Sequence, residues 1–156
     1  MVAIEKLKQL LAEDILQLDE LAALLAQEKA LLSRSDVKGL EPITQQKDAL
    51  LGRLRERAKQ KIHLLVEMGY RPDRGDPSRF IASSGIQDLV APWHEAETKL
   101  KTCQSLNSVN GRIVGHLQKR LARLSDIFRG TTGQQKLYGA TGQQTSVSQR
   151  TILASA

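Results

Sequence analysis

The chain has 156 residues, of which 40% are hydrophobic and 3% aromatic, and its formal net charge is +6. So few aromatic residues argue against β-sandwiches, barrels and most small-molecule pockets, and the length suits one domain with a sizeable core. The single cysteine, Cys103, excludes a disulfide framework within the chain. Without a long apolar run or a signal-peptide core, the chain is expected to be cytoplasmic and largely helical.

The positive charge is distributed unevenly along the chain. Residues 1–100 carry 15 Lys and Arg against 16 Asp and Glu, whereas residues 101–156 carry eight against one. The whole excess therefore lies in the last third, which indicates a basic end that meets an acidic partner or surface.

A first helix is predicted from about residue 3 to residue 34. Its seven-residue repeat places a broad apolar stripe on one side, formed by Ile4, Leu11, Leu18, Leu25 and Leu32. Asp14 and Glu28 interrupt the row beside this stripe. Together with the other acidic residues of the segment, they are expected to lie on a solvated surface.

A second helix is expected to start near Pro42, because Gly39 and the Glu41-Pro42 step break the pattern and proline favours the first turn of a helix. Its apolar side runs from Ile43 to Met68. Basic residues alternate through its middle and fan out over several faces, which predicts a solvated sleeve: Arg53, Arg55, Arg57, Lys59 and Lys61.

The connection formed by residues 69–88 contains three glycines and two prolines. Asp76 and Pro77 are suited to cap one short helix that reaches Ile81. The Arg74-Gly75-Asp76 tripeptide resembles an adhesion motif, which we attribute to chance in a chain with cytoplasmic features.

A third helix is predicted from Asp88, or from Pro92 if proline sets its first turn, to Arg129. Two rows of seven-residue spacing line it, one through Leu89 and Cys103 and the other through Trp93 and Leu121. Asn107 and Asn110 place a polar layer in this seam, where buried asparagines fix register. About 40 residues span roughly 60 Å, so part of this helix must overhang the others or they must be offset to cover it.

The last segment, residues 130–156, differs in composition from the rest of the chain. Of its 27 residues, 17 are Gly, Gln, Thr or Ser and none is acidic. Such a composition predicts a flexible extension to a helical domain of residues 1–129. Leu137, Tyr138, Ile152 and Leu153 are short apolar anchors of the kind that order on a partner.

The sequence contains no recognisable catalytic constellation. The histidines are scattered, the lone cysteine lies on the seam, and no glycine-rich loop has the spacing of a phosphate cradle. We therefore expect no enzyme activity, metal, cofactor or small-molecule substrate. A basic side of the third helix offers phosphate contacts, but without a helix-turn-helix or an aromatic platform nucleic acid is the less favoured partner: Arg112, His116, Lys119, Arg120 and Arg123.

The segment Leu137-Tyr138-Gly139-Ala140-Thr141-Gly142-Gln143, after an Asn-containing last helix, resembles the FlgN family of flagellar export chaperones. The resemblance implies a cytoplasmic, non-catalytic chaperone that binds the first and third hook-associated proteins. It would prevent their premature assembly and deliver them to the type III export apparatus. Tyr138 is implied to dock at the membrane protein of the export gate, and the Gln/Thr-rich extension beyond Gly142 departs from the family pattern.

These patterns predict an all-α antiparallel bundle of three long helices with a flexible C-terminal extension and, optionally, a short helix within residues 69–88. The expected client-binding residues lie on the third helix and the tail: Leu117, Leu121, Leu124, Ile127, Phe128, Leu137, Ile152 and Leu153. For at least half of the helix positions, an intramolecular core is the competing interpretation.

The alternative function is a helical structural or adaptor subunit that binds nucleic acid through the third helix. The regular repeats suit a monomer or a weak dimer.

Overall fold

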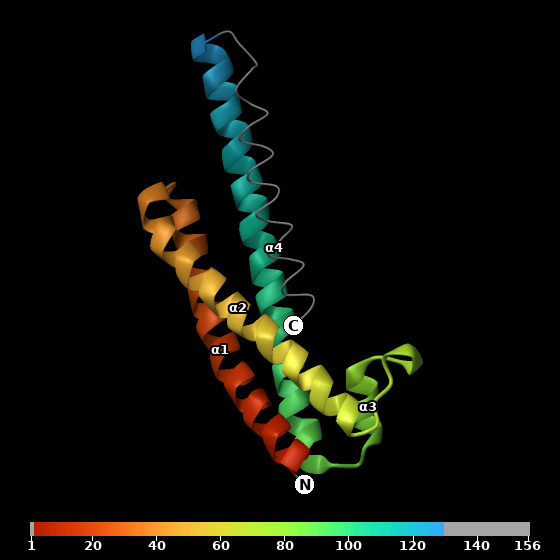
Figure 1. Ribbon diagram of the computed structural model, residues 1–156. Helices are drawn as coiled ribbons and strands as arrows, with labels where there is room; N and C mark the ends of the chain where they lie inside the picture. The colour runs from red at the N-terminus through yellow and green to blue at the C-terminus, as the bar shows by residue number, and fades with distance from the viewer. Residues whose placement is uncertain (1, 130–156) are drawn as a thin grey trace.

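The computed structural model describes residues 2–129, with side chains described for residues 2–127. These residues form four α-helices and a short 3₁₀ helix, and they contain no strand, which confirms the all-α prediction. The elements are α1 (Val2–Ser33), α2 (Val37–Glu67), η1 (Pro72–Arg74), α3 (Pro77–Ser83) and α4 (Gln87–Arg129) (Figure 1). None of the helices among residues 2–129 is long and apolar enough to cross a membrane.

Helix α1 is the common partner of the other two long helices (Figure 1). It runs antiparallel to α2, since Asp14 pairs with Lys61 and Glu28 pairs with Lys47. It runs parallel to α4, whose Cys103 contacts the carbonyl of Leu18. Helices α2 and α4 approach each other much less closely than either approaches α1, so the mutual packing expected of a three-helix antiparallel bundle is not confirmed.

The start of α2 differs from the prediction. The helix begins at Val37, five residues before Pro42, because the Asp36 carboxylate caps it by accepting the Gly39 amide at 3.1 Å. Pro42 lies inside the helix, where its missing N–H removes only one backbone hydrogen bond. Pro92 likewise lies inside α4, so the start near Asp88 is confirmed and the alternative start at Pro92 is wrong.

The hydrophobic core follows the predicted leucine stripe. Leu11, Leu18 and Leu25 are at most 3% exposed, and they pack in one cluster with apolar residues of α2 and α4. Each buried leucine contributes about 1.5–3 kcal/mol relative to an exposed one. The stripe of α1 therefore supplies most of the surface on which both other long helices are held.

The connection between α2 and α4 is an ordered structure built on the predicted short helix. Asp76 caps α3 by accepting the Arg79 amide at 2.9 Å. The buried Tyr70 donates its hydroxyl hydrogen to the Gly75 carbonyl at 2.9 Å, and its ring packs against Phe80. Trp93 of α4 donates its indole N–H to Ser78 at 3.0 Å, which ties α3 to the start of the last helix.

Candidate functional site

The last part of α4 extends past the end of the α1–α2 hairpin (Figure 1). Cys103 contacts the carbonyl of Leu18 and Asn110 donates to the carbonyl of Leu25, so the two parallel helices share a constant offset of 85 positions. Since α1 ends at Ser33, the last turns of α4 have no residue of α1 beside them. Residues 119–129 are the part of α4 beyond α1, and at 1.5 Å per residue they project by roughly 16 Å. The predicted overhang is confirmed.

We call residues 111–129 the arm. No side chain described there is buried, whereas Asn110, immediately before it, is 3% exposed. Leu121 is 58% exposed, Leu124 is 51% exposed and Ile127 is 77% exposed. Leu117 is half-buried and lies on the same helix face as Leu121 and Leu124. Their assignment to client binding stays a prediction, but Leu121, Leu124 and Ile127 are not part of the core formed by residues 2–127.

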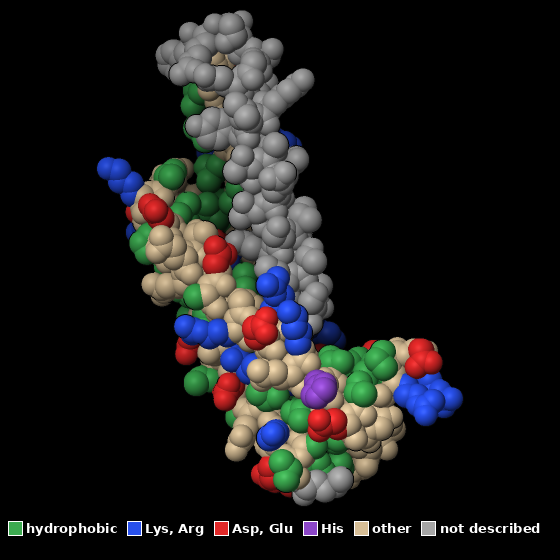
Figure 2. Space-filling model, in the orientation of Figure 1, with side chains coloured by type: hydrophobic (Ala, Val, Ile, Leu, Met, Phe, Trp, Pro, Cys, Tyr) green, Lys and Arg blue, Asp and Glu red, His purple; other side chains and the backbone are tan. Residues whose placement is uncertain are grey.

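The arm is also distinguished by its charge. Arg112, Lys119, Arg120 and Arg123 are exposed, and none of them forms an ion pair with another described residue. Asp126 is the one acidic residue after position 100. Over the hairpin, in contrast, positive and negative side chains are intermixed (Figure 2). The arm thus combines exposed leucines with positive charge that the described residues do not neutralise.

A buried polar layer anchors α4 just before the arm. The Lys47 ammonium donates to both carboxylate oxygens of Glu28, at 3.0 and 3.1 Å, and to the amide oxygen of Asn107 at 3.4 Å. Asn110 donates to Glu28 at 2.8 Å and to the Leu25 carbonyl at 2.9 Å. All four residues of this layer are at most 8% exposed. The predicted asparagine layer is confirmed, and it joins all three long helices at the base of the arm.

A second buried ionic layer lies nearer the other end of the hairpin. Asp14 accepts from Arg57 at 2.6 Å and pairs with Lys61 at 2.5 Å, and Arg57 also bonds to Gln17. The expectation that Asp14, Glu28, Arg57 and Lys61 lie on solvated surfaces is therefore wrong. A buried carboxylate is tolerated where a cation and further hydrogen bonds replace its water.

The burial of Asp14, Glu28, Lys47 and Lys61 had a signal in the sequence. Asp14 and Glu28 are 14 positions apart on α1, and their partners Lys61 and Lys47 are 14 positions apart on α2. In an antiparallel helix pair such matched spacing places each acid opposite a base. The pattern of either helix alone does not contain this match, because the match lies between the spacings of two helices.

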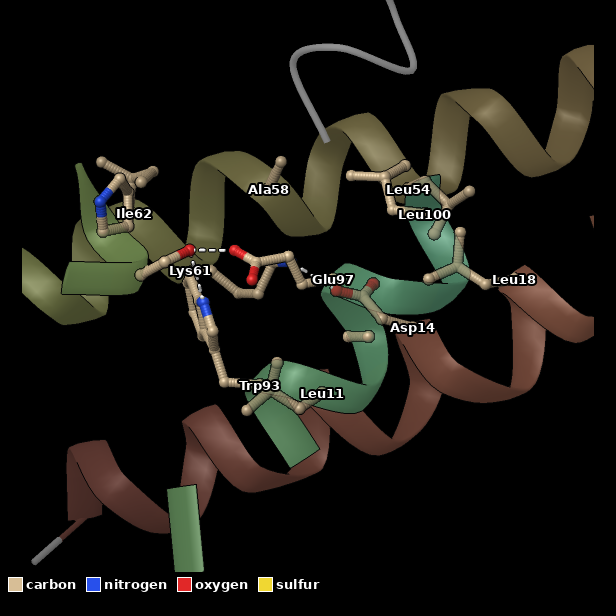
Figure 3. A pocket seen from close by; sticks show the side chains of 13 residues that line it. Leu11, Asp14, Leu18, Leu54, Ala58, Lys61, Ile62, Trp93, Glu97 and Leu100 are labelled. Carbon is tan, nitrogen blue, oxygen red and sulfur yellow. Dashed lines mark hydrogen bonds and ion pairs between the residues drawn. The ribbon is translucent and has the colours of Figure 1, made fainter. Parts of the chain in front are cut away.

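A cavity of about 300 Å³ lies beside the second layer, where α2 and α4 diverge across α1 (Figure 3). Side chains of α1, α2 and α4 converge on it, and Lys61 lies 5.5 Å from the centre of the Trp93 ring. Its lining is mainly aliphatic and aromatic, and it also contains Asp14, Lys61, Ser78 and Glu97. The hydroxyl of Ser78 bonds to Glu97, so the polar groups at its edge have partners within the chain.

The thiol of Cys103 is withdrawn from the surface of the described residues. Cys103 is fully buried, and burial together with the nearby charge of Asp19 raises the pKa of its thiol to about 11. Among residues 2–129 no group of His, Cys, Asp and Glu is arranged to hold a metal ion. The predicted tail residues Leu137, Tyr138, Ile152 and Leu153, and the side chain of Phe128, lie outside the part of the chain that is described in this detail.

Comparison with known proteins places the chain in a family. The model of the FlgN protein family matches residues 1–146. A crystal structure described as a flagella synthesis protein FlgN, from Pseudomonas aeruginosa, is similar with a TM-score of 0.59 and 29% sequence identity over 67% of this chain and 83% of that chain. No curated protein sequence matches. Because the family match spans the hairpin, α4 and the arm, the chain belongs to the FlgN family, as the resemblance in its sequence indicated.

Proposed function

We propose that this chain acts in flagellum assembly as a cytoplasmic export chaperone. It holds hook-associated proteins through the arm of α4, keeps them unassembled and delivers them to the type III export apparatus. The observation that carries this proposal is the exposure of Leu121 and Leu124 on a helix end that the rest of the described chain leaves uncovered. Membership of the FlgN family and the similarity to a flagella synthesis protein support a role in flagellum assembly.

The chemistry of filament subunits fits such a role. Subunits that assemble through amphipathic helices expose an apolar stripe before assembly, and a chaperone prevents assembly by covering that stripe with one of its own. An arm that projects beyond the hairpin can reach such a helix without disturbing the core. A flexible segment that becomes ordered only on its partner loses conformational entropy as it binds. Its affinity is therefore moderate, which suits a client that must later be released.

The roles of the tail belong to the same proposal. Residues 130–156 extend the client-binding surface with Leu137, Ile152 and Leu153, and Tyr138 docks on the membrane protein of the export gate. Deleting residues 130–156 should weaken client binding while the helical domain stays folded. An unchanged affinity for purified hook-associated protein would contradict the assignment of the tail.

The arm is tested by paired substitutions of exposed apolar residues. We expect Leu121→Ser with Leu124→Ser to weaken binding of the first or third hook-associated protein at least tenfold in calorimetric titration. Truncating a hot-spot residue at the centre of an interface costs about 2 kcal/mol or more of binding free energy. Leu16 and Val66 are exposed at 63% and 48% on the hairpin, so Leu16→Ser with Val66→Ser is the matched control. Equal affinities of the two double variants would refute the proposed binding surface.

A further inference from the structure

The two edges of the leucine stripe on the arm differ in chemistry. At 100° per residue, Arg120 and Arg123 fall on one side of the face that contains Leu117, Leu121 and Leu124. On the opposite side, the residues up to position 127 are uncharged and most of them are small: Gly111, Gly115, Gln118, Ala122 and Ser125. Over residues 111–127 the arm is therefore an apolar stripe with one basic edge and one uncharged edge.

The basic edge of the arm lies in a part of the chain that has almost no carboxylates. Residues 1–100 carry 16 Asp and Glu with their 15 Lys and Arg, whereas Asp126 is the one acidic residue of the arm. Lys47, Arg57 and Lys61 are each paired with a carboxylate of α1, and the partly exposed Lys8 and Lys99 pair with Asp88 and Asp19. Hydrogen bonds to these carboxylates raise the pKa values of Lys8 and Lys99. Arg120 and Arg123 are exposed and have no ion pair with any described residue, so both guanidinium groups are available to carboxylates of a partner.

We infer that the partner of the arm is an acidic amphipathic α-helix, which packs its apolar face on Leu117, Leu121 and Leu124 and places carboxylates against Arg120 and Arg123. This inference rests on the proposed function and names the chemistry of the client segment. A helix laid along the stripe brings the flanking positions of both helices into contact, as in coiled coils, where opposite charges at these positions select the partner.

Two other occupants of the stripe fit less well. A second copy of the arm presents the same basic edge and only Asp126 as a carboxylate, so it cannot neutralise Arg120 and Arg123. Nucleic acid would neutralise the arginines but would leave Leu121 and Leu124 exposed, because phosphate contacts make no use of an apolar stripe. An acidic helix is the partner that satisfies the stripe and its edge together.

The experiment uses the full chain and synthetic amphipathic peptides of three heptads with a leucine stripe. One peptide carries glutamate on both flanks of the stripe, a second carries glutamine and a third carries lysine. We expect fluorescence anisotropy to show that the glutamate peptide binds about tenfold more tightly than the glutamine peptide. Raising the salt concentration should reduce this difference.

Charge reversal on the chain identifies the edge. Arg120→Glu with Arg123→Glu should weaken the glutamate peptide at least tenfold and strengthen the lysine peptide. Arg53→Glu with Arg55→Glu changes the net charge equally at exposed positions of α2 and should alter neither affinity. Circular dichroism should show unchanged helicity in both double variants, because all four positions are exposed.

Four outcomes would overturn the inference of an acidic helical partner. Wild-type chain that binds none of the peptides, or binds the glutamate and glutamine peptides equally, overturns the inference. Tight binding of a DNA or RNA duplex that is lost on Arg120→Glu with Arg123→Glu but kept on Leu121→Ser with Leu124→Ser assigns the edge to nucleic acid and also overturns it. Hook-associated proteins that bind normally to the charge-reversed chain leave the chaperone proposal intact while removing the acidic helix as the explanation.

Discussion

The two halves of α4 have the same sequence pattern and opposite surroundings. One row of seven-residue spacing runs through Leu89, Cys103 and Asn110, which are at most 3% exposed, and continues to Leu124, which is 51% exposed. The difference arises because α1 ends at Ser33 while α4 continues. A seven-residue repeat therefore identifies which face of a helix is apolar, and the lengths of its neighbours decide whether that face is core or binding surface.

The largest effect is expected where the packed half is anchored. Lys47→Ala removes the cation that neutralises Glu28 and leaves a buried carboxylate with Asn110 as its remaining described donor. Breaking a buried ion pair from one side costs about 3–5 kcal/mol of unfolding free energy. Urea denaturation followed by circular dichroism measures this loss.

A double variant separates charge from packing in the same layer. Glu28→Leu with Lys47→Leu replaces the ion pair by apolar side chains and should recover much of the stability lost in Lys47→Ala, because no unneutralised charge remains buried. A double variant as unstable as Lys47→Ala would mean that the hydrogen bonds of the layer, and not its buried charge, determine its stability.

Matched leucine truncations compare the two halves directly. Leu89 is fully buried, so Leu89→Ala should lower the unfolding free energy by about 2–5 kcal/mol through lost burial and the cavity left behind. Leu124→Ala should change it by less than about 0.5 kcal/mol, as expected for an exposed position. Comparable losses in urea denaturation would show that the arm is covered within the folded chain.

Thiol reactivity offers a kinetic version of this comparison. The Cys103 thiol has a pKa raised to about 11, so at pH 8 only about one part in a thousand is thiolate, and burial restricts access further. Reaction with Ellman's reagent should be slow at pH 8, should accelerate as the pH rises toward 11, and should be fast in urea. A cysteine introduced as Leu124→Cys with Cys103→Ala should react at least a hundredfold faster. Equal rates for the two thiols would contradict the assignment of packed and exposed halves.

The sequence specified local features of the fold well. The leucine repeat of α1, the Asp76 cap of α3 and the asparagine layer of α4 each follow from residue type and spacing within one segment, and each is confirmed. The start of α2 differs from the prediction because Asp36 caps the helix before Pro42 is reached. Proline removes one backbone hydrogen bond inside the helix, so its presence alone did not identify where the helix begins.

The binding surface was only partly accessible to such reasoning. Exposed leucines at 121 and 124 look the same in the sequence as core leucines at 89, because their surroundings depend on the register between helices distant in the chain. The buried charges of Asp14 and Lys61 were missed for the same reason, since their burial depends on a pairing across the hairpin. Contacts between segments, and not the patterns within them, decided both cases.

The smallest effects test whether the arm and the core unfold together. A Cβ atom added at Gly52 of α2 or Gly115 of the arm would meet no described atom within 4 Å beyond the neighbouring backbone of its own helix, so alanine fits both sites. Each substitution should stabilise its own helix by about 0.5–1 kcal/mol, because glycine loses more backbone freedom on folding than alanine does.

Gly52→Ala should raise the urea midpoint of the whole chain. Gly115→Ala should instead slow amide hydrogen exchange in residues 111–127 by up to about fivefold without moving that midpoint, because an element with no buried side chain opens locally. A midpoint raised equally by both would mean that the arm unfolds with the core, and its leucines would then have to be counted as structural before they are counted as a binding surface.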